Sequence, residues 1–124
     1  MTLKRLAASA LIALAALAGV THWRASARET AAEAAHPATG QFVTVDGKRL
    51  HYEMQGAGPD LVMIHGASGS LRDLTFSRRD QLTDRYRVTV VDRPGLGHSD
   101  PLDDTSLQAQ AQAIKAGVAQ LGVR

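Results

Sequence analysis

The sequence predicts an α/β fold in which a β-hairpin leads into a parallel strand–helix–strand crossover, preceded by a hydrophobic helix at the amino terminus. Three observations predict it. Two short runs of alternating polarity flank Asp46-Gly47, and two runs of apolar and β-branched residues follow at 61–64 and 88–91. An almost unbroken apolar segment occupies 6–20. The foldable part therefore lies in the last two thirds of the chain.

The composition is that of one small domain with no marked charge excess. The chain has 124 residues, 14 basic and 12 acidic side chains, and no cysteine. The missing cysteines exclude disulfide frameworks and thiolate chemistry, while leaving the compartment open. The basic residues form no continuous stripe, so we expect no nucleic acid among the partners.

The amino terminus is predicted to be a membrane-targeting segment. Lys4 and Arg5 precede the apolar run, which as a helix would extend roughly 22 Å, or about 27 Å if it continues to Trp23. Two interpretations remain open. One is a cleaved signal peptide with a small-residue cleavage site at 25–27. The other is an uncleaved transmembrane anchor with Trp23 at the membrane interface.

Both interpretations send the rest of the chain across a membrane, because basic residues ahead of an apolar segment tend to stay cytoplasmic. We expect contact with lipid through residues 6–23 in a bacterial-type cell envelope. The protein would be anchored in the inner membrane and face the periplasm, or be secreted if cleaved after Ala27. The expected organisation is a targeting segment at 1–27, a linker at 28–40 and a folded part at 41–124.

The folded part is expected to begin with a hairpin. The runs Gln41–Val45 and Arg49–Met54 alternate in polarity around Asp46-Gly47, a dipeptide that favours the two-residue turns of hairpins. A glycine-rich loop follows at 55–59.

The crossover is predicted from two strands and the helix between them. All four residues of Leu61–Ile64 are apolar, so both faces of this strand should be covered, as in a central strand. A helix is expected over 70–82 and a second buried strand over 88–91, connected by a right-handed crossover.

A second helix is expected to begin after an N-cap at Thr105 or Ser106 and to end at Gly122. Gly117 inside it should cost up to about 1 kcal/mol of helix stability. The predicted apolar stripe comprises Leu107, Ala111, Ile114, Val118 and Leu121.

Two loops follow the buried strands, at the edge where open α/β sheets bind their ligands. The first reads His65-Gly66-Ala67-Ser68-Gly69-Ser70, and the second reads Asp92-Arg93-Pro94-Gly95-Leu96-Gly97-His98-Ser99-Asp100. At this spacing the pair resembles the α/β-hydrolase family, in which a His-Gly loop follows the third strand and an Asp-Arg-Pro-Gly-x-Gly-x-Ser loop follows the fourth. The resemblance covers about 41–124 and implies the N-terminal part of an α/β-hydrolase sheet.

The resemblance also implies roles for the loop residues. The backbone N–H of Ala67 would be an oxyanion-hole donor that meets the negative charge developing on an ester-like substrate during acyl transfer. The residues that would bind substrate or shape this loop are His65, Gly66, Ser68 and Gly69. The residues that would give the second loop its structure are Asp92, Arg93, Pro94, Gly95, Gly97 and Ser99. No cofactor is implied.

The family's nucleophile elbow, Gly-x-Ser-x-Gly or Gly-x-Asp-x-Gly, does not occur in the 124 residues. Pro101 stands where the motif starting at Gly97 needs its second glycine, and in the run 66–69 the second glycine comes one place early. We therefore expect nucleophile, catalytic acid and catalytic base all to be missing. The chain would be an inactive N-terminal fragment of an envelope-located hydrolase.

Two further expectations follow from the same residues. The family's strand order 1-2-4-3-5 would leave 61–64 at an exposed edge when no fifth strand is present. The histidine and acidic residues at His98, Asp100, Asp103 and Asp104 have a spacing that fits no usual metal site, so no metal centre is expected.

Two alternative functions remain open. A nucleotide-binding crossover would explain Gly66 and Gly69 after one strand and Asp92 at the end of the next, where a ribose-binding acid can lie, although the full glycine motif is missing. A non-catalytic, membrane-tethered interaction fragment would explain the missing nucleophile but would leave both loops without a purpose.

Overall fold

The computed structural model describes residues 3–123 and divides into two compact units, one ending at Pro37 and one beginning at Ala38. The first unit is a single helix, α1 (Leu3–Ala35). It is long and apolar enough to cross a membrane, a property that signal sequences share. The helix continues past Arg28 without a break, so much of the segment expected as a linker is helical, and it ends shortly before Pro37, which cannot extend it.

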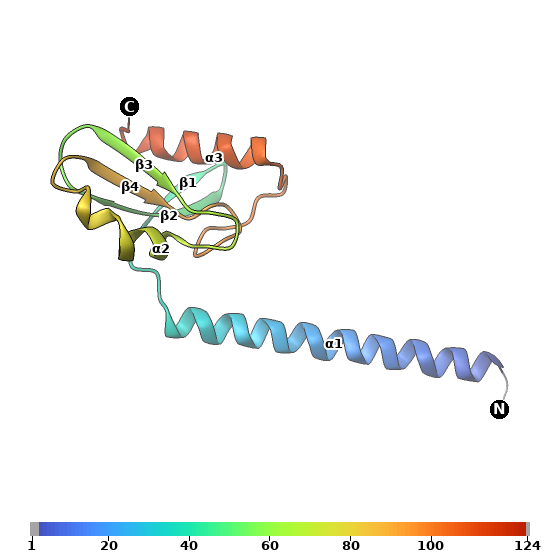
Figure 1. Ribbon diagram of the computed structural model, residues 1–124. Helices are drawn as coiled ribbons and strands as arrows, with labels where there is room; N and C mark the ends of the chain where they lie inside the picture. The colour runs from blue at the N-terminus through green and yellow to red at the C-terminus, as the bar shows by residue number, and fades with distance from the viewer. Residues whose placement is uncertain (1–2, 124) are drawn as a thin grey trace. The chain divides into compact units, whose positions relative to one another are not determined.

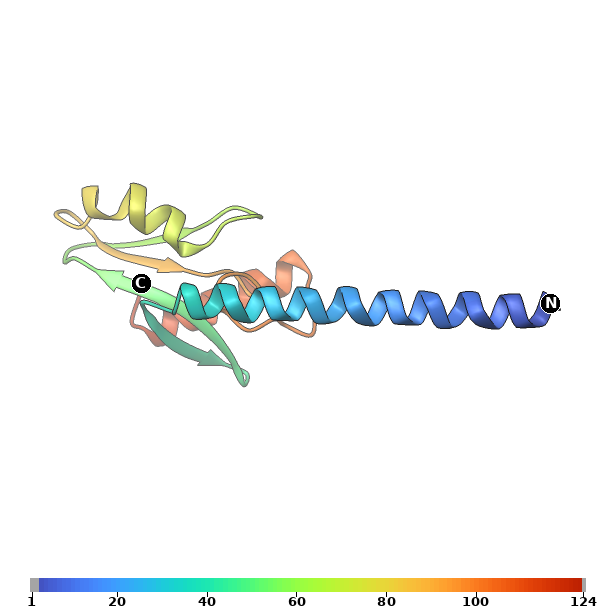
Figure 2. The same ribbon diagram turned by 90° about the horizontal axis from the view of Figure 1, so that it is seen from below.

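The second unit is a four-stranded mixed sheet, with a helix on each face (Figures 1 and 2). The strands are β1 (Gln41–Val45), β2 (Lys48–Gln55), β3 (Asp60–Ile64) and β4 (Arg87–Val91). Their order is β1-β2-β4-β3. The pairs β1–β2 and β2–β4 are antiparallel, whereas β3 and β4 are parallel. This arrangement confirms the predicted hairpin, the crossover and the order of the four strands.

The hairpin turn has the conformation that its two residues favour. Asp46 and Gly47 have φ angles of 48° and 78°, which are the left-handed values of a type I′ turn. The turn sets the register in which Val45 lies opposite Lys48.

The two helices bury separate apolar clusters on the two faces of the sheet. Helix α2 (Leu71–Ser77) covers Val88 and Val90 with Leu71, and all three are at most 1% exposed. Helix α3 (Leu107–Gln120) packs Ala113 against Val45 and Leu50 of the hairpin. The helix on each face explains why β4 is buried from Val88 to Val91.

The prediction of one continuous helix over 70–82 is wrong. Helix α2 ends at Ser77, and Arg78, with φ −135°, leaves the helical region before a short 3-10 turn, η1 (Arg79–Gln81). The run from Ser77 to Gln81 is wholly polar and offers no apolar stripe that could bury an extended helix against the sheet.

Helix α3 begins and ends as predicted but buries a different face. The Ser106 hydroxyl accepts the Ala109 N–H at 3.2 Å as N-cap, and Gly122 ends the helix at φ 74°. The predicted apolar stripe is wrong at its start, because Leu107 is 75% exposed and Ala111 is also exposed.

The buried face of α3 instead comprises Ala113, Ile114 and Gly117. A Cβ atom on Gly117 would lie 3.1 Å from Leu50 Cδ1 and 3.3 Å from Val43 Cγ1. Glycine therefore allows the helix to approach the hairpin closely. The contact face therefore combines one large apolar side chain, Ile114, with the small residues Ala113 and Gly117.

Strand β3 lies at the edge of the sheet among the described residues. Its apolar pattern indicates a strand covered on both faces, but Ile64 is 50% exposed. The interpretation as a central strand is therefore wrong for these residues, whereas the exposed edge expected from the order 1-2-4-3 is confirmed.

Candidate active site

The two predicted loops, 65–70 and 92–100, lie at the same edge of the sheet because they follow β3 and β4, which are parallel. Side chains at the start of both loops are buried, with His65 5% and Asp92 1% exposed. Buried polar groups need hydrogen-bond partners, and these partners define the geometry of the site.

Asp92 is the acceptor at the centre of the network. Its Oδ1 accepts the Leu71 N–H at 2.7 Å, while its Oδ2 accepts from the His98 N–H at 3.1 Å and lies 2.8 Å from His51 Nδ1. Burial alone would raise the pKa of this carboxyl, but the hydrogen bonds from His51, Leu71 and His98 outweigh it and hold the pKa below its ordinary value. Asp92 is therefore a buried carboxylate whose two oxygens already have donors.

His51, from β2, is held in one tautomer. Its Nε2 lies 3.1 Å from the backbone nitrogen of Gly40, whose N–H donates to it. Because it accepts this hydrogen bond, Nε2 carries no proton. The proton of the neutral ring therefore lies on Nδ1, which donates to Asp92.

His65 is held in the same tautomer by a different backbone donor. The Arg93 N–H donates to Nε2 at 3.0 Å, so Nδ1 carries the proton and donates to the Gly66 carbonyl at 2.8 Å. The Nε2 atom also lies 3.5 Å from Asp92 Oδ1. This contact is not an ion pair, because an Nε2 atom that accepts the Arg93 proton has none to share with the carboxylate.

The end of the second loop is tied to β2. The Ser99 hydroxyl donates to the Asp92 carbonyl at 2.8 Å and accepts the His51 N–H at 2.9 Å. Next to it, the Arg49 N–H donates to Asp100 Oδ2 at 2.8 Å and the Asp100 N–H donates to the Arg49 carbonyl at 2.9 Å. The Arg49 guanidinium also holds the pKa of Asp100 below its ordinary value.

Gly97 fits where no other residue fits without strain. Its φ is 55°, and a Cβ atom there would lie 2.3 Å from atoms of the Asp92 carboxylate. Of the other predicted loop residues, Pro94 is buried, and Gly95, with φ 75°, donates its N–H to the Asp100 carbonyl at 3.1 Å. The second loop therefore closes on itself around Asp92.

Ala67 lies in the first loop, where Gly66 and Ser68 beside it are also exposed. A turn closes under it, because the Gly69 N–H donates to the Gly66 carbonyl at 3.3 Å. Among the residues that the structure describes, the Ala67 N–H donates no hydrogen bond. An exposed donor on a loop with fixed ends can receive an anionic oxygen.

The cluster of His51, Asp92 and His98 brings possible ligand atoms within 4.8 Å of one another. A metal ion on His51 Nδ1 would force the ring proton onto Nε2, where it would face the Gly40 N–H. The donor pattern therefore fits a hydrogen-bonded network and does not fit a metal centre.

The acidic residues after the second loop have separate partners. Asp103 accepts from the Lys48 ammonium at 3.0 Å. Asp104 accepts the Ser106 N–H at 2.9 Å, and this hydrogen bond at the start of α3 lowers the pKa of Asp104. The two carboxylates therefore bind different elements, the hairpin and the cap of α3.

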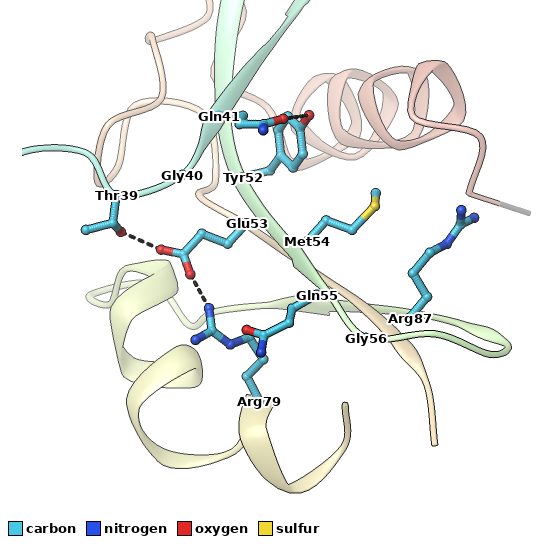
Figure 3. Close-up of a pocket in the computed structure, with 10 residues that line it drawn as sticks. All are labelled: Thr39, Gly40, Gln41, Tyr52, Glu53, Met54, Gln55, Gly56, Arg79 and Arg87. Atoms are coloured by element: carbon cyan, nitrogen blue, oxygen red, sulfur yellow. Dashed lines mark hydrogen bonds and ion pairs between the residues drawn. The ribbon is translucent and has the colours of Figure 1, made fainter. Parts of the chain in front are cut away.

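A cavity of about 590 Å³ lies along β2 and extends to the amino end of β4 (Figure 3). Within it the Glu53 carboxylate accepts from Thr39 and pairs with Arg79. None of the predicted site residues lines this cavity, whose walls are formed by Thr39, Gly40, Gln41, Tyr52, Glu53, Met54, Gln55, Gly56, Arg79 and Arg87. Its volume therefore does not identify the chemistry of the loops.

Sequence reasoning missed His51 and Gly40. Neither belongs to a loop motif, and His51 lies 41 positions before Asp92 along the chain. The alternation of β2 indicates only that His51 is on the opposite face from Leu50 and Tyr52. No local signal marks it as a partner of the second loop.

Comparison with protein-family models finds no match. Among curated proteins, the chain is 38% identical over 85 residues to the dihydrolipoyllysine-residue acetyltransferase component of the acetoin cleaving system of Cupriavidus necator, covering 67% of the chain and 22% of that protein. It is 44% identical over 69 residues to a pimeloyl-[acyl-carrier protein] methyl ester esterase of Methylococcus capsulatus, covering 56% and 27%. The chain thus spans about a quarter of the length of these relatives.

Two solved structures are similar to the chain. An alpha/beta hydrolase fold protein from Burkholderia ambifaria matches with a TM-score of 0.61 and 30% identity, over 67% of this chain and 31% of that one. A membrane phospholipase A matches with a TM-score of 0.60 and 28% identity, over 98% of this chain and 42% of that one. The second match therefore includes nearly all of α1 as well as the sheet.

Proposed function

The chain belongs to the α/β-hydrolase family and contains the opening part of that fold, and from this premise we propose that it contributes the oxyanion loop of an ester hydrolase. The intact enzyme would act on a small ester-like molecule. Its nucleophile, catalytic acid and catalytic base would come from residues other than these 124, since the chain has no nucleophile elbow. The chain alone would be inactive.

The observation that carries the proposal is the Ala67 N–H. It lies exposed beyond β3, and among the described residues it donates to no internal acceptor. One such donor contributes roughly 2.7–4 kcal/mol to transition-state stabilisation in acyl transfer. A match to a methyl ester esterase is consistent with this class of reaction.

The proposed location is the cell envelope, with lipid contact through residues 6–23. Helix α1 has the length and composition of a membrane span. The match to a membrane phospholipase A supports an anchor because it covers 98% of this chain. Orientation toward the periplasm, and cleavage after Ala27 as the alternative to anchoring, are part of the proposal.

The nucleotide-binding alternative is disfavoured by the state of Asp92. A ribose-binding acid must offer free oxygens to sugar hydroxyls. Both Asp92 oxygens instead accept protons from His51, Leu71 and His98, and the side chain is 1% exposed.

The test compares the complete gene product with the 124-residue chain on a series of p-nitrophenyl esters. We expect hydrolysis by the complete product only. In the complete product, Ala67→Pro removes the N–H and should lower kcat by about 10²- to 10³-fold. Ala67→Gly keeps the N–H and serves as the matched control.

Equal kcat values for the Pro and Gly variants would contradict the role of Ala67. Full turnover by residues 1–124 alone would contradict the assignment of the nucleophile to another part of the protein. A complete product that hydrolyses no ester would favour the non-catalytic, membrane-tethered alternative.

A further inference from the structure

The loop that carries Ala67 is clamped at both ends by neighbouring residues of the second loop. At its start, the His65 ring accepts the Arg93 N–H at 3.0 Å. At its end, the Leu71 N–H donates to Asp92 Oδ1 at 2.7 Å. The position of Leu71, at the end of the loop, therefore depends on where the Asp92 carboxylate is held.

The Asp92 carboxylate is held in turn by one side chain outside both loops. His51 is 1% exposed and donates from Nδ1 to Asp92 Oδ2 at 2.8 Å. Its ring contacts two others, with centroids 5.1 Å from Phe42 and 5.2 Å from His98. This packing leaves the imidazole little freedom to rotate away from the carboxylate.

The donor role of His51 is itself set by a backbone group. The Gly40 N–H donates to Nε2 at 3.1 Å, so that only the tautomer with the proton on Nδ1 has both nitrogens satisfied. A Cβ atom on Gly40 would lie 2.1 Å from the Tyr52 carbonyl oxygen. Glycine at position 40 thus lets the chain approach β2 closely enough to reach the ring.

We propose that His51 is a positioning residue for the oxyanion loop. The Gly40 backbone, where the chain enters the sheet domain, orients His51. His51 in turn fixes Asp92, and Asp92 fixes Leu71 at the end of the loop. The inference rests on the proposed function in so far as the loop holds an oxyanion. The hydrogen-bonded relay from Gly40 through His51 and Asp92 to Leu71 can be tested without catalysis.

The first measurement uses the full 124-residue chain, labelled with ¹⁵N, in detergent micelles. NMR correlation of the His51 ring nitrogens with the ring carbon protons identifies which nitrogen carries the proton. We expect the proton on Nδ1 and an unprotonated Nε2, as the two hydrogen bonds require. A proton on Nε2 would overturn the inference, and this measurement requires no substitution.

The second measurement separates positioning from general stability with two isosteric variants. In His51→Asn the side-chain amide can replace Nδ1 as donor to Asp92, whereas in His51→Gln the carbonyl oxygen can replace Nε2 as acceptor from Gly40 and the donor to Asp92 is lost. His98→Asn is the matched control, because it removes the neighbouring imidazole and keeps the backbone N–H that Asp92 accepts.

The readout is hydrogen exchange of the Leu71 amide relative to the buried Val90 amide of β4 in the same sample. We expect His51→Gln to accelerate Leu71 exchange about tenfold relative to Val90. The Asn variant and the His98→Asn control should remain within about threefold of the parent chain. Equal acceleration of exchange at the Leu71 and Val90 amides would mean that His51 only packs in the core, and would overturn the inference. Equal Leu71 exchange rates in the Asn and Gln variants would overturn it as well.

Failure of the relay and failure of the proposed function give different results. If the tautomer and exchange results are as expected but Ala67→Pro has full esterase activity in the complete gene product, the relay stands and the oxyanion role is wrong. If Ala67→Pro is impaired and the two His51 variants exchange alike, the oxyanion role stands and His51 does not position the loop.

Discussion

The two polar clusters of the sheet domain differ in what holds them. Around Asp92 the donors are mostly backbone N–H groups, and the carboxylate is 1% exposed. Around Glu53 the donors are side chains, a threonine hydroxyl and the Arg79 guanidinium (Figure 3). The second cluster borders a cavity and remains partly exposed, with side-chain values of 15% for Glu53 and 19% for Arg79.

The difference shows where geometry is rigid enough for chemistry. Backbone donors are placed by the strands and loops themselves, so ordering them at the site costs little additional side-chain entropy. A pair such as Glu53 and Arg79 must immobilise two long side chains, which costs conformational entropy. In this protein the cavity therefore accompanies the less rigid cluster, whereas the exposed Ala67 N–H lies beside the more rigid one.

The largest expected effect comes from truncating each acidic side chain. Asp92→Ala removes the acceptor of three buried or half-buried N–H groups and should lower the free energy of unfolding by about 3–5 kcal/mol, since each unsatisfied donor costs about 1–3 kcal/mol. Glu53→Ala should cost only about 1 kcal/mol, since the Arg79 guanidinium can turn toward solvent. Both losses of stability can be measured by denaturant unfolding of the chain in detergent. Hydrogen exchange of the Val90 amide then gives a second measurement of each. Equal losses would remove the distinction between the clusters.

The next largest effect tests the close approach to Asp92. Gly97→Ala places a Cβ atom against the carboxylate and should cost about 2–3 kcal/mol of stability. Gly122→Ala is the matched control, since Gly122 also has a positive φ, 74°, but nothing lies within 4 Å of its Cβ position. That variant should lose about 1 kcal/mol, the cost of the backbone conformation alone. If both variants lose the same amount, the contact with Asp92 is not what requires glycine.

A smaller effect is expected from acid. The folded-state pKa of Asp92 is lowered from its ordinary value of 3.8, so below that value the unfolded chain binds the proton more readily than the folded chain. The stability due to Asp92 is fully present above the ordinary value and is lost as the pH falls through the folded-state pKa. One such group changes the free energy of unfolding by at most about 1.4 kcal/mol per pH unit.

A series of unfolding measurements from pH 5 downward can detect this acid dependence. In Asp92→Asn the slope of the free energy of unfolding against pH should decrease by the contribution of one carboxyl group. The partly exposed Asp100 also has a lowered pKa, and Asp100→Asn should change the slope less because solvent screens its pairing with Arg49. A parent slope that Asp92→Asn leaves unchanged would show that this carboxyl does not control acid stability.

The smallest effect is expected at the surface. Asp103 pairs with Lys48 at 3.0 Å, but its side chain is 94% exposed. Asp103→Asn should change the free energy of unfolding by less than about 0.5 kcal/mol. A loss above 1 kcal/mol in the same unfolding assay would mean that ion pairs of side chains matter more here than the comparison of the two clusters implies.

Local patterns were sufficient for much of the fold. The dipeptide Asp46-Gly47 predicted the hairpin, because few residues other than glycine, asparagine and aspartate adopt its left-handed angles. The β-branched run at 88–91 predicted a buried strand, and Ser106 an N-cap. The continuous helix over 70–82 and the apolar stripe of α3 were wrong, because both depend on which side chains the sheet accepts.

The candidate site likewise contains residues that the sequence predicted and residues that it did not. The motifs containing Ala67 and Asp92 are contiguous in sequence and follow consecutive parallel strands, so their meeting at one sheet edge was predictable. The roles of Gly40 and His51 were not, because their contacts join residues far apart along the chain and have no sequence spacing of their own. The assignment of Ala67 as an oxyanion donor stays a prediction.

The sequence by itself determined the strands, the turn and the two loops, since each depends on the backbone preferences and polarity of adjacent residues. Only the tertiary structure decided which groups satisfy the buried polar atoms. The tautomer of His51 follows from a Gly40 amide that is 11 positions away in the chain and 3.1 Å away in space. Distance in space, which governs a hydrogen bond, is determined only when the whole sheet has formed.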